Sequence, residues 1–131
     1  MSDTIELKES QLGKQAIVCS LNRSLRFHWA KNKKIKKQYE LIIRNQMSLN
    51  NITKAIVGER FSLHIVSYRK RLLDHDNLYG AHKWLIDALC NELFIFEDDP
   101  KHCKITIDQY SVKKQSDRSY PATVITRSVY H

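Results

Sequence analysis

The residues best suited to chemistry in this chain are aspartates, gathered in one central stretch of a protein whose formal net charge is +8. Asp74 and Asp76 are two positions apart, so in an extended segment their side chains point to the same side while that of His75 points away. Asp98 and Asp99 follow after a gap of helical length, and we expect them to fold back toward the first pair. Mg²⁺ binds through carboxylate oxygens together with phosphate oxygens of a substrate. The stretch therefore suits a Mg²⁺ site, and the alternative, which the spacing of Asp74 and Asp76 by itself favours, is a polar turn that caps a helix.

The segment between these aspartates has the pattern of a helix. Its apolar residues recur at three- and four-residue spacing and would share one buried face: Leu78, Ala81, Leu85, Ala88, Leu89 and Leu93. Asp76 or Asn77 is expected to cap the helix by accepting a hydrogen bond from a first-turn N–H. Lys83 lies about two turns after Asp76 on nearly the same face, and helical side chains lean toward the N-terminus. Lys83 is thus a candidate to reach a metal-bound phosphate, and the alternative is an ordinary ion pair with Asp87.

These residues, taken together, resemble the RusA-type Holliday-junction resolvases. The similarity is carried by four groups of residues, Asp74–Leu78, Lys83, Asp87–Leu89 and Glu97–Asp99, and more weakly by Asn22–Lys31. The resemblance implies a small, homodimeric, Mg²⁺-dependent endonuclease that cuts branched DNA such as four-way junctions. It also implies that Asp74, Asp76 and Asp99 are the metal-binding and catalytic carboxylates.

The resemblance further implies a catalytic lysine and a metal complement. The family's lysine often lies four residues after the second aspartate, a position that is Gly80 here, and a phage-type spacing assigns its role to Lys83. One or two Mg²⁺ ions are expected, with Mn²⁺ able to substitute and no small-molecule cofactor. In a two-metal site the ions lie about 4 Å apart and clamp the attacking and leaving oxygens. Asp98 is a candidate to orient a metal-bound water by accepting a hydrogen bond.

A basic segment precedes the acidic stretch. Between residues 22 and 44 there are eight Lys or Arg and a single acidic residue, Glu40, so the segment carries a net charge of +7. Such clustering is the electrostatic footprint of a protein that binds nucleic acid. The residues expected to contact DNA are Asn22, Arg23, Arg26, Trp29, Lys31, Lys33, Lys34 and Lys37. Phe27 and Trp29 suit base stacking and core packing equally well.

The order of elements predicts one α+β domain over residues 1–131, built as β-α-β-α-β-β with two helices packed on a mixed sheet. We expect a loose start at residues 1–10, and strands at 15–21, 61–69, 103–112 and 122–129. A first helix should carry the apolar stripe between Ile35 and Met47 and end near 48–51. A bulge is expected near Asp108, where the apolar residues of the third strand change parity.

Two other functions fit the same residues: a non-catalytic basic nucleic-acid-binding module, and a broader branched-DNA or flap nuclease of the same fold. The acidic stretch separates the first of these from a nuclease, because carboxylates repel phosphate unless a cation lies between them. Cys19, Cys90 and Cys103 show no paired spacing, which favours reduced thiols and disfavours a zinc site. With a polar N-terminus and no apolar run of membrane-spanning length, the sequence predicts a cytoplasmic protein. The resemblance to the RusA-type resolvases implies a bacterial cell, with the gene carried by the host or by a phage.

Overall fold

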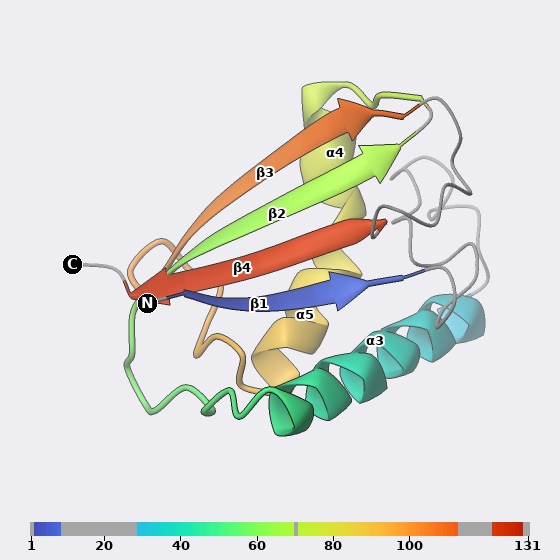
Figure 1. The fold of residues 1–131 in the computed structure, drawn as a ribbon. Coiled ribbons are helices and arrows are strands. Elements are labelled where there is room, and N and C mark those ends of the chain that lie inside the picture. The colour runs from blue at the N-terminus through green and yellow to red at the C-terminus, as the bar shows by residue number, and fades with distance from the viewer. Residues whose placement is uncertain (1, 9–28, 70, 113–121, 130–131) are drawn as a thin grey trace.

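The computed structural model describes residues 2–8, 29–69, 71–112 and 122–129. These residues form a four-stranded mixed sheet with three helices on one of its faces (Figure 1). The strands are β1 (Ser2–Leu7), β2 (Phe61–Arg69), β3 (Cys103–Ser111) and β4 (Thr123–Val129). The helices are α3 (Trp29–Leu49), α4 (His75–Ala81) and α5 (Lys83–Asn91). The predicted α+β class with a mixed sheet is confirmed.

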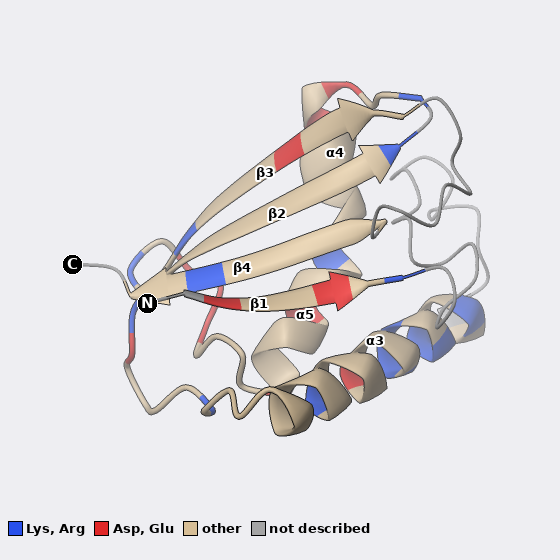
Figure 2. Cartoon of the chain, in the orientation of Figure 1, with Lys and Arg blue, Asp and Glu red and all other residues tan. Residues whose placement is uncertain are grey.

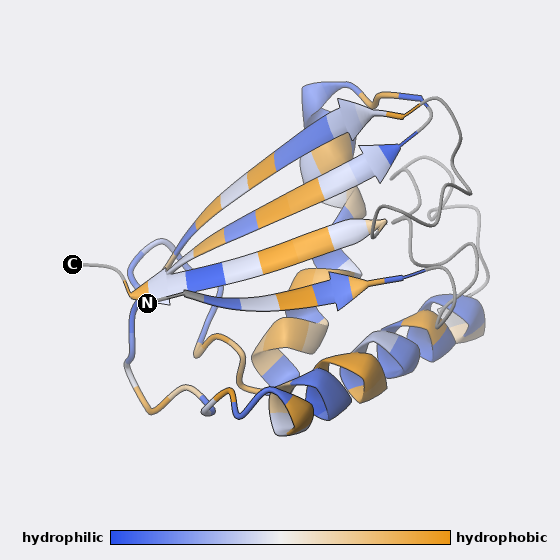
Figure 3. Ribbon diagram, in the orientation of Figure 1, coloured by the Kyte–Doolittle hydropathy of each residue, from blue (hydrophilic) through white to orange (hydrophobic). Residues whose placement is uncertain are grey.

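The register of the sheet explains why its inner face is a core. The strand order is β1-β4-β2-β3, with β2 and β3 parallel and the other two pairs antiparallel. One row of the sheet carries an isoleucine on every strand, and all four are buried: Ile5, Ile125, Ile65 and Ile107. The apolar bands of the strands are visible in Figure 3. The ladder between β2 and β3 runs without interruption through Val66 and Asp108, so the predicted bulge is absent.

The start of the chain is where the sequence prediction was wrong. Residues 2–7 belong to a regular edge strand that pairs with β4 from Ser2↔Ser128 to Leu7↔Thr123. Ile5 and Leu7 point into the core, and their burial stabilises a segment that is polar in composition. The strand predicted at 15–21 lies outside the described residues.

The first predicted helix is confirmed as α3. The helix ends at Leu49, within the expected range. The residues of its apolar stripe are buried: Ile35, Tyr39, Ile43 and Met47. α3 packs against α5, and Arg44 fastens the two by donating hydrogen bonds of 2.8 and 3.0 Å to the two carboxylate oxygens of Glu92. None of the described helices combines the length and the apolar character needed to cross a membrane.

The second predicted helix is in fact two, α4 and α5, separated at His82. A single helix was expected because the apolar stripe continues across the break, with Ala81 and Leu85 both buried. The His82 ring supplies the cause of the break. Its Nδ1 lies 2.7 Å from the Leu78 carbonyl, the acceptor that the His82 backbone N–H would use in a continuous helix. The His82 N–H instead bonds to the Tyr79 carbonyl at 3.3 Å, which tightens the last turn of α4.

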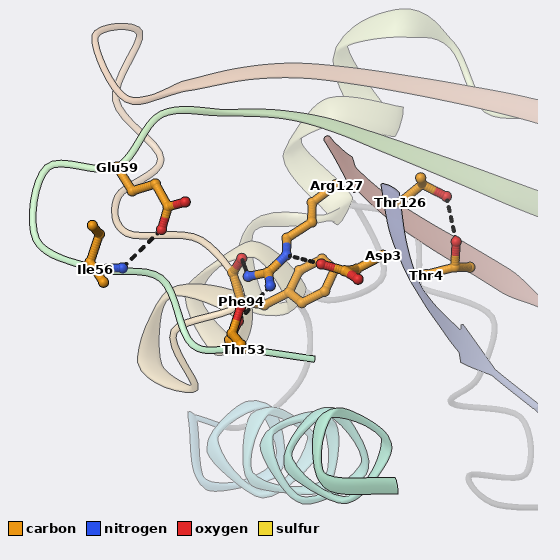
Figure 4. A network of polar contacts seen from close by, with 8 residues as sticks. All are labelled: Asp3, Thr4, Thr53, Ile56, Glu59, Phe94, Thr126 and Arg127. Atoms are coloured by element: carbon orange, nitrogen blue, oxygen red, sulfur yellow. Dashed lines mark hydrogen bonds and ion pairs between the residues drawn. The ribbon is translucent and has the colours of Figure 1, made fainter. Parts of the chain in front are cut away.

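A buried arginine holds the loops that precede β2 and β3 (Figure 4). Arg127 of β4 is 3% exposed and donates to the Asp3 carboxylate at 3.0 Å and to the Phe94 carbonyl at 2.7 Å. A third hydrogen bond reaches the Thr53 carbonyl. The guanidinium carbon lies 4.8 and 4.7 Å from the ring centroids of Phe61 and Phe94. Arg127 therefore satisfies backbone groups that no strand or helix would otherwise pair.

Candidate functional site

Asp74 and Asp76 lie at the N-terminus of α4. Asp74 is the N-cap: its backbone is extended and its Oδ1 accepts a hydrogen bond of 2.8 Å from the Asn77 N–H. The cap predicted at Asp76 or Asn77 is therefore wrong by two or three positions. The alternation expected around His75 is also wrong, because His75 already belongs to the helix and its ring lies 4.8 Å from that of Tyr79. Both carboxylates remain exposed at a helix end that favours negative charge.

The chain just before Asp74 is fixed to the free edge of β3. The Gln109 side chain accepts a hydrogen bond of 2.9 Å from the Leu73 N–H and donates one of 2.6 Å to the Leu73 carbonyl. Further along β3, the Ile107 N–H donates to the Tyr79 hydroxyl at 3.2 Å. Edge strands present unpaired backbone groups, and here a side chain of α4 occupies one of them. These contacts place the carboxylates of Asp74 and Asp76 beside the C-terminal end of β3.

Asp99 lies at the other end of the same strand. Its carbonyl accepts a hydrogen bond of 2.9 Å from the N–H of Cys103, the first residue of β3. Gln109, which holds the Asp74 end, lies six residues further along β3, and a strand rises about 3.3 Å per residue, so the two ends are about 20 Å apart. The expected folding back of Asp98 and Asp99 onto Asp74 and Asp76 therefore does not occur within one chain. The reason is the parallel pairing of β2 and β3, because α4 and α5 must return the chain across the sheet before β3 begins.

The structure gathers a different group around Asp99. Glu97, Asp99 and His102 each offer one ligand atom, and these atoms lie within 4.8 Å of one another. Within the described ranges this is the group of His, Cys, Asp and Glu side chains that could hold a metal ion. Two carboxylates together with one imidazole suit Mn²⁺ or Zn²⁺. An ion that prefers oxygen ligands alone could use the two carboxylates. The spacing Glu-x-Asp-x-x-His was present in the sequence and would have identified Glu97 and His102.

The hydrogen bonds of Asp99 set its protonation. Partial burial by itself raises the pKa of the Asp99 carboxyl, but hydrogen bonds from the His102 side chain and backbone N–H outweigh it, so the pKa is lowered below its usual value. The Asp99 Oδ1 lies 2.8 Å from His102 Nδ1 and 2.9 Å from the His102 backbone nitrogen. Asp99 is therefore ionised at neutral pH, as a metal ligand must be. Asp98 is exposed beside it.

Lys83 begins α5 and is exposed. The break at His82 separates it from α4, so Lys83 and Asp76 do not share the face of one continuous helix as predicted. Among the described residues no ion pair joins Lys83 to Asp87, so the ion pair expected as the alternative role of this lysine does not form. The lysine side chain remains available to an external anion.

The basic face lies on the first turns of α3, where the blue bands of Figure 2 gather. Lys31, Lys33, Lys34 and Lys37 are exposed there, and the first turn has no acidic residue. Positive charge at a helix N-terminus opposes the macrodipole, so these lysines do not stabilise the helix itself. Lys36 lies beside them with its Nζ 5.9 Å from the Trp84 ring centroid. Of the other predicted DNA-binding residues, Trp29 begins α3, while Asn22, Arg23 and Arg26 lie outside the described residues.

No protein-family model, no curated protein and no solved structure matches this chain. The arrangement of charged and metal-ligating groups therefore has to carry the functional conclusion.

Proposed function

We propose that this protein is a homodimeric, Mg²⁺-dependent endonuclease that cuts branched DNA, with four-way junctions as its substrate. The observation that carries the proposal is the pair of exposed carboxylates, Asp74 and Asp76, held at the start of α4 by the contact between Leu73 and Gln109. A strongly basic protein gains nothing in DNA affinity from such a pair unless a cation bridges it to phosphate. The exposed lysines of α3 supply the backbone contacts that DNA binding needs.

In this proposal the metal site is completed by a second copy of the chain. Asp99 lies about 20 Å from Asp74 and Asp76 along β3, so it cannot join them within one chain. A two-fold axis between the two positions brings Asp99 of each chain to the aspartate pair of the other, since isologous interfaces pair residue i with j and j with i. Two identical composite sites result, as paired cuts across a two-fold symmetric junction require.

The chemistry of the proposed site follows from its ligands. Mg²⁺, or Mn²⁺ in its place, would lower the pKa of a bound water and neutralise the non-bridging phosphate oxygens. Lys83 would stabilise charge that develops on the phosphate. Glu97 and His102 would accompany Asp99 into the site, and the imidazole predicts higher activity with Mn²⁺ than the carboxylates alone would give.

Complementation between inactive chains tests the composite site. Asp74→Asn/Asp76→Asn and Asp99→Asn are each expected to abolish cleavage of a synthetic junction while binding persists. If each site uses both chains, a mixture of the two variants contains dimers with one intact site, and cleavage returns to a substantial fraction of the wild-type rate. Glu40→Gln serves as the matched control, since it removes a carboxylate from α3, away from both aspartate positions, and should cut normally.

A mixture that stays inactive would exclude the composite site, and cleavage by Asp76→Asn alone would exclude the assignment of Asp76 as an essential metal ligand. The separation of Asp99 from the aspartate pair within one chain favours one rival, a non-catalytic nucleic-acid-binding module. That module predicts salt-dependent DNA binding with no cleavage in Mg²⁺ or Mn²⁺. Comparing junction, flap and linear duplex substrates separates a junction resolvase from a broader branched-DNA nuclease.

A further inference from the structure

The sheet has one face that no described helix covers, the face toward the viewer in Figure 1. On β2 and β3 the odd-numbered residues point to the helices, and the even-numbered ones point to this open face. At the C-terminal end of the two strands the open face carries two aromatic residues, Tyr68 and Tyr110, which are partners in the parallel ladder. Their ring centroids lie 5.9 Å apart with an interplanar angle of 30°.

Tyr110 is the outer member of this pair. It is 53% exposed, although a tyrosine on a strand normally buries most of its ring. It lies on the edge strand, next to Gln109, the residue that fixes Leu73 and hence the aspartate pair. Gln109 is odd-numbered and points to the helix side, so this partly supported aromatic surface lies at the same end of β3 as the aspartate pair but on the opposite face of the sheet.

The charges around the pair decide which part of a nucleic acid fits there. Two residues before Tyr110, the Asp108 carboxylate lies 2.7 Å from His64 Nε2 on the same face. This carboxylate disfavours a phosphate directly over the face. The exposed Arg71, where the chain leaves β2, offers a cation for the sugar-phosphate backbone at its margin. The open face thus suits an uncharged base more than a phosphate.

We propose that Tyr110, backed by Tyr68, is the platform on which an unpaired base of the bound DNA stacks. The proposal rests on the proposed function and makes Tyr110 a determinant of preference for branched DNA over uninterrupted duplex. Bases in a duplex are already stacked, whereas bases at a branch point can be splayed out. Aromatic stacking is tolerant of base identity, since every base has a π-face.

The test compares Tyr110→Ala and Tyr110→Phe with Thr106→Ala, an exposed position on the same face of β3. Affinity is measured in Ca²⁺, without cleavage, for a junction that carries 2-aminopurine at its branch point and for a continuous duplex of the same length. Loss of one base–aromatic stack should weaken junction binding by roughly 5- to 100-fold. Duplex affinity should not change, and the quenching of 2-aminopurine by the wild type should disappear. Tyr110→Phe should behave as the wild type.

Three results would overturn the proposal: equal junction affinity of Tyr110→Ala and Thr106→Ala, equal loss for junction and duplex, or a change of oligomeric state with DNA binding intact. The last would assign the ring to a protein contact. The same experiments distinguish failure of the proposed nuclease function from failure of the stacking proposal. If the wild type cuts no DNA in Mg²⁺ or Mn²⁺ but Tyr110→Ala still loses its junction preference, the stacking platform stands and the nuclease does not.

Discussion

Gln109 holds Leu73 as a neighbouring strand would, since its side-chain amide bonds both backbone groups of Leu73, at 2.9 and 2.6 Å. One side chain thereby satisfies a stretch of backbone that no strand pairs. The contact also fixes where α4 begins, because Asp74 is the next residue and caps the helix. The position of the aspartate pair thus depends on a residue that is itself no candidate ligand.

Replacement of Gln109 should loosen this end of the fold. Gln109→Ala loses two hydrogen bonds, each worth about 0.5–1.5 kcal/mol, so the free energy of unfolding should fall by about 1–3 kcal/mol. Urea unfolding measures the difference, with Thr106→Ala on the same strand as the control. Gln109→Glu keeps the acceptor for the Leu73 N–H and loses the donor to the Leu73 carbonyl. Its free energy of unfolding should lie between those of Gln109→Ala and Thr106→Ala. Equal stability of Gln109→Ala and Thr106→Ala would show that the contact contributes nothing.

Arg127 should matter far more to stability than its ion-pair partner. Arg127→Met leaves the carbonyls of Phe94 and Thr53 without their buried donor, and the free energy of unfolding should fall by about 2–4 kcal/mol. The side chain of Asp3 is 42% exposed, so Asp3→Asn should cost less than about 1 kcal/mol. Thermal unfolding of both variants checks the contrast, and equally mild effects would contradict a structural role for the guanidinium.

Stability should depend on pH through His82. Burial lowers the pKa of His82 from 6.5 to about 4, and its Nε2 has no hydrogen-bond partner. The unfolded chain therefore takes up a proton first as pH falls, and stability declines between pH 6.5 and about 4, by at most about 3 kcal/mol. Urea unfolding across this range should show the slope in the wild type and in the exposed-site control His75→Asn.

His82→Asn should abolish that slope, because Asn does not titrate and its amide can still donate toward the Leu78 carbonyl. An unchanged slope in His82→Asn would assign the pH dependence to another group.

Asp99 contributes to stability in a separate pH range. Its pKa is lowered on folding, so its contribution is present at neutral pH and is lost at more acidic pH, below the usual carboxyl range.

The thiols of Cys90 and Cys103 should be unreactive in the native protein. Burial, with a smaller effect of the Asp98 charge, raises the pKa of Cys90 to about 12 and that of Cys103 to about 11. The thiolate is the reactive form, so little of it exists at pH 8. In a Cys19→Ser background, a thiol reagent should label neither residue until guanidinium is added. Rapid labelling of two thiols at pH 8 would contradict this assignment.

The sequence predicted those elements whose signal is local. α3, β2, β3 and β4 follow from apolar periodicity, and each was found within a few residues of its predicted bounds. β1 was missed because only Ile5 and Leu7 face the core, and the strand is defined by its pairing with β4 at the far end of the chain. The break at His82 was missed because the His82 ring takes the place of the His82 backbone N–H at the Leu78 carbonyl. This exchange does not change the spacing of the apolar residues.

For the candidate site, sequence identified the carboxylates but not their arrangement. Asp74, Asp76 and Asn77 all suit a helix cap, and the choice of Asp74 follows from the contact between Leu73 and the remote Gln109. Proximity in sequence suggested that Asp99 would return to the aspartate pair. The parallel ladder between β2 and β3 sends it to the opposite end of the sheet, a consequence of strand order that no local pattern encodes.

The central place of β4 in the sheet sets the order of events during synthesis. Among the four strands that the structure describes, β1 is made before the others, yet its neighbour in the sheet is β4, which is made after them and also joins β1 to β2. An emerging chain can form α3 and pair β2 with β3, but Ile5 and Leu7 stay without the partner strand β4 until that strand has been synthesised. Contacts between such distant segments slow folding. A nascent chain stalled before β4 would therefore expose an apolar sheet edge and become a substrate for chaperones.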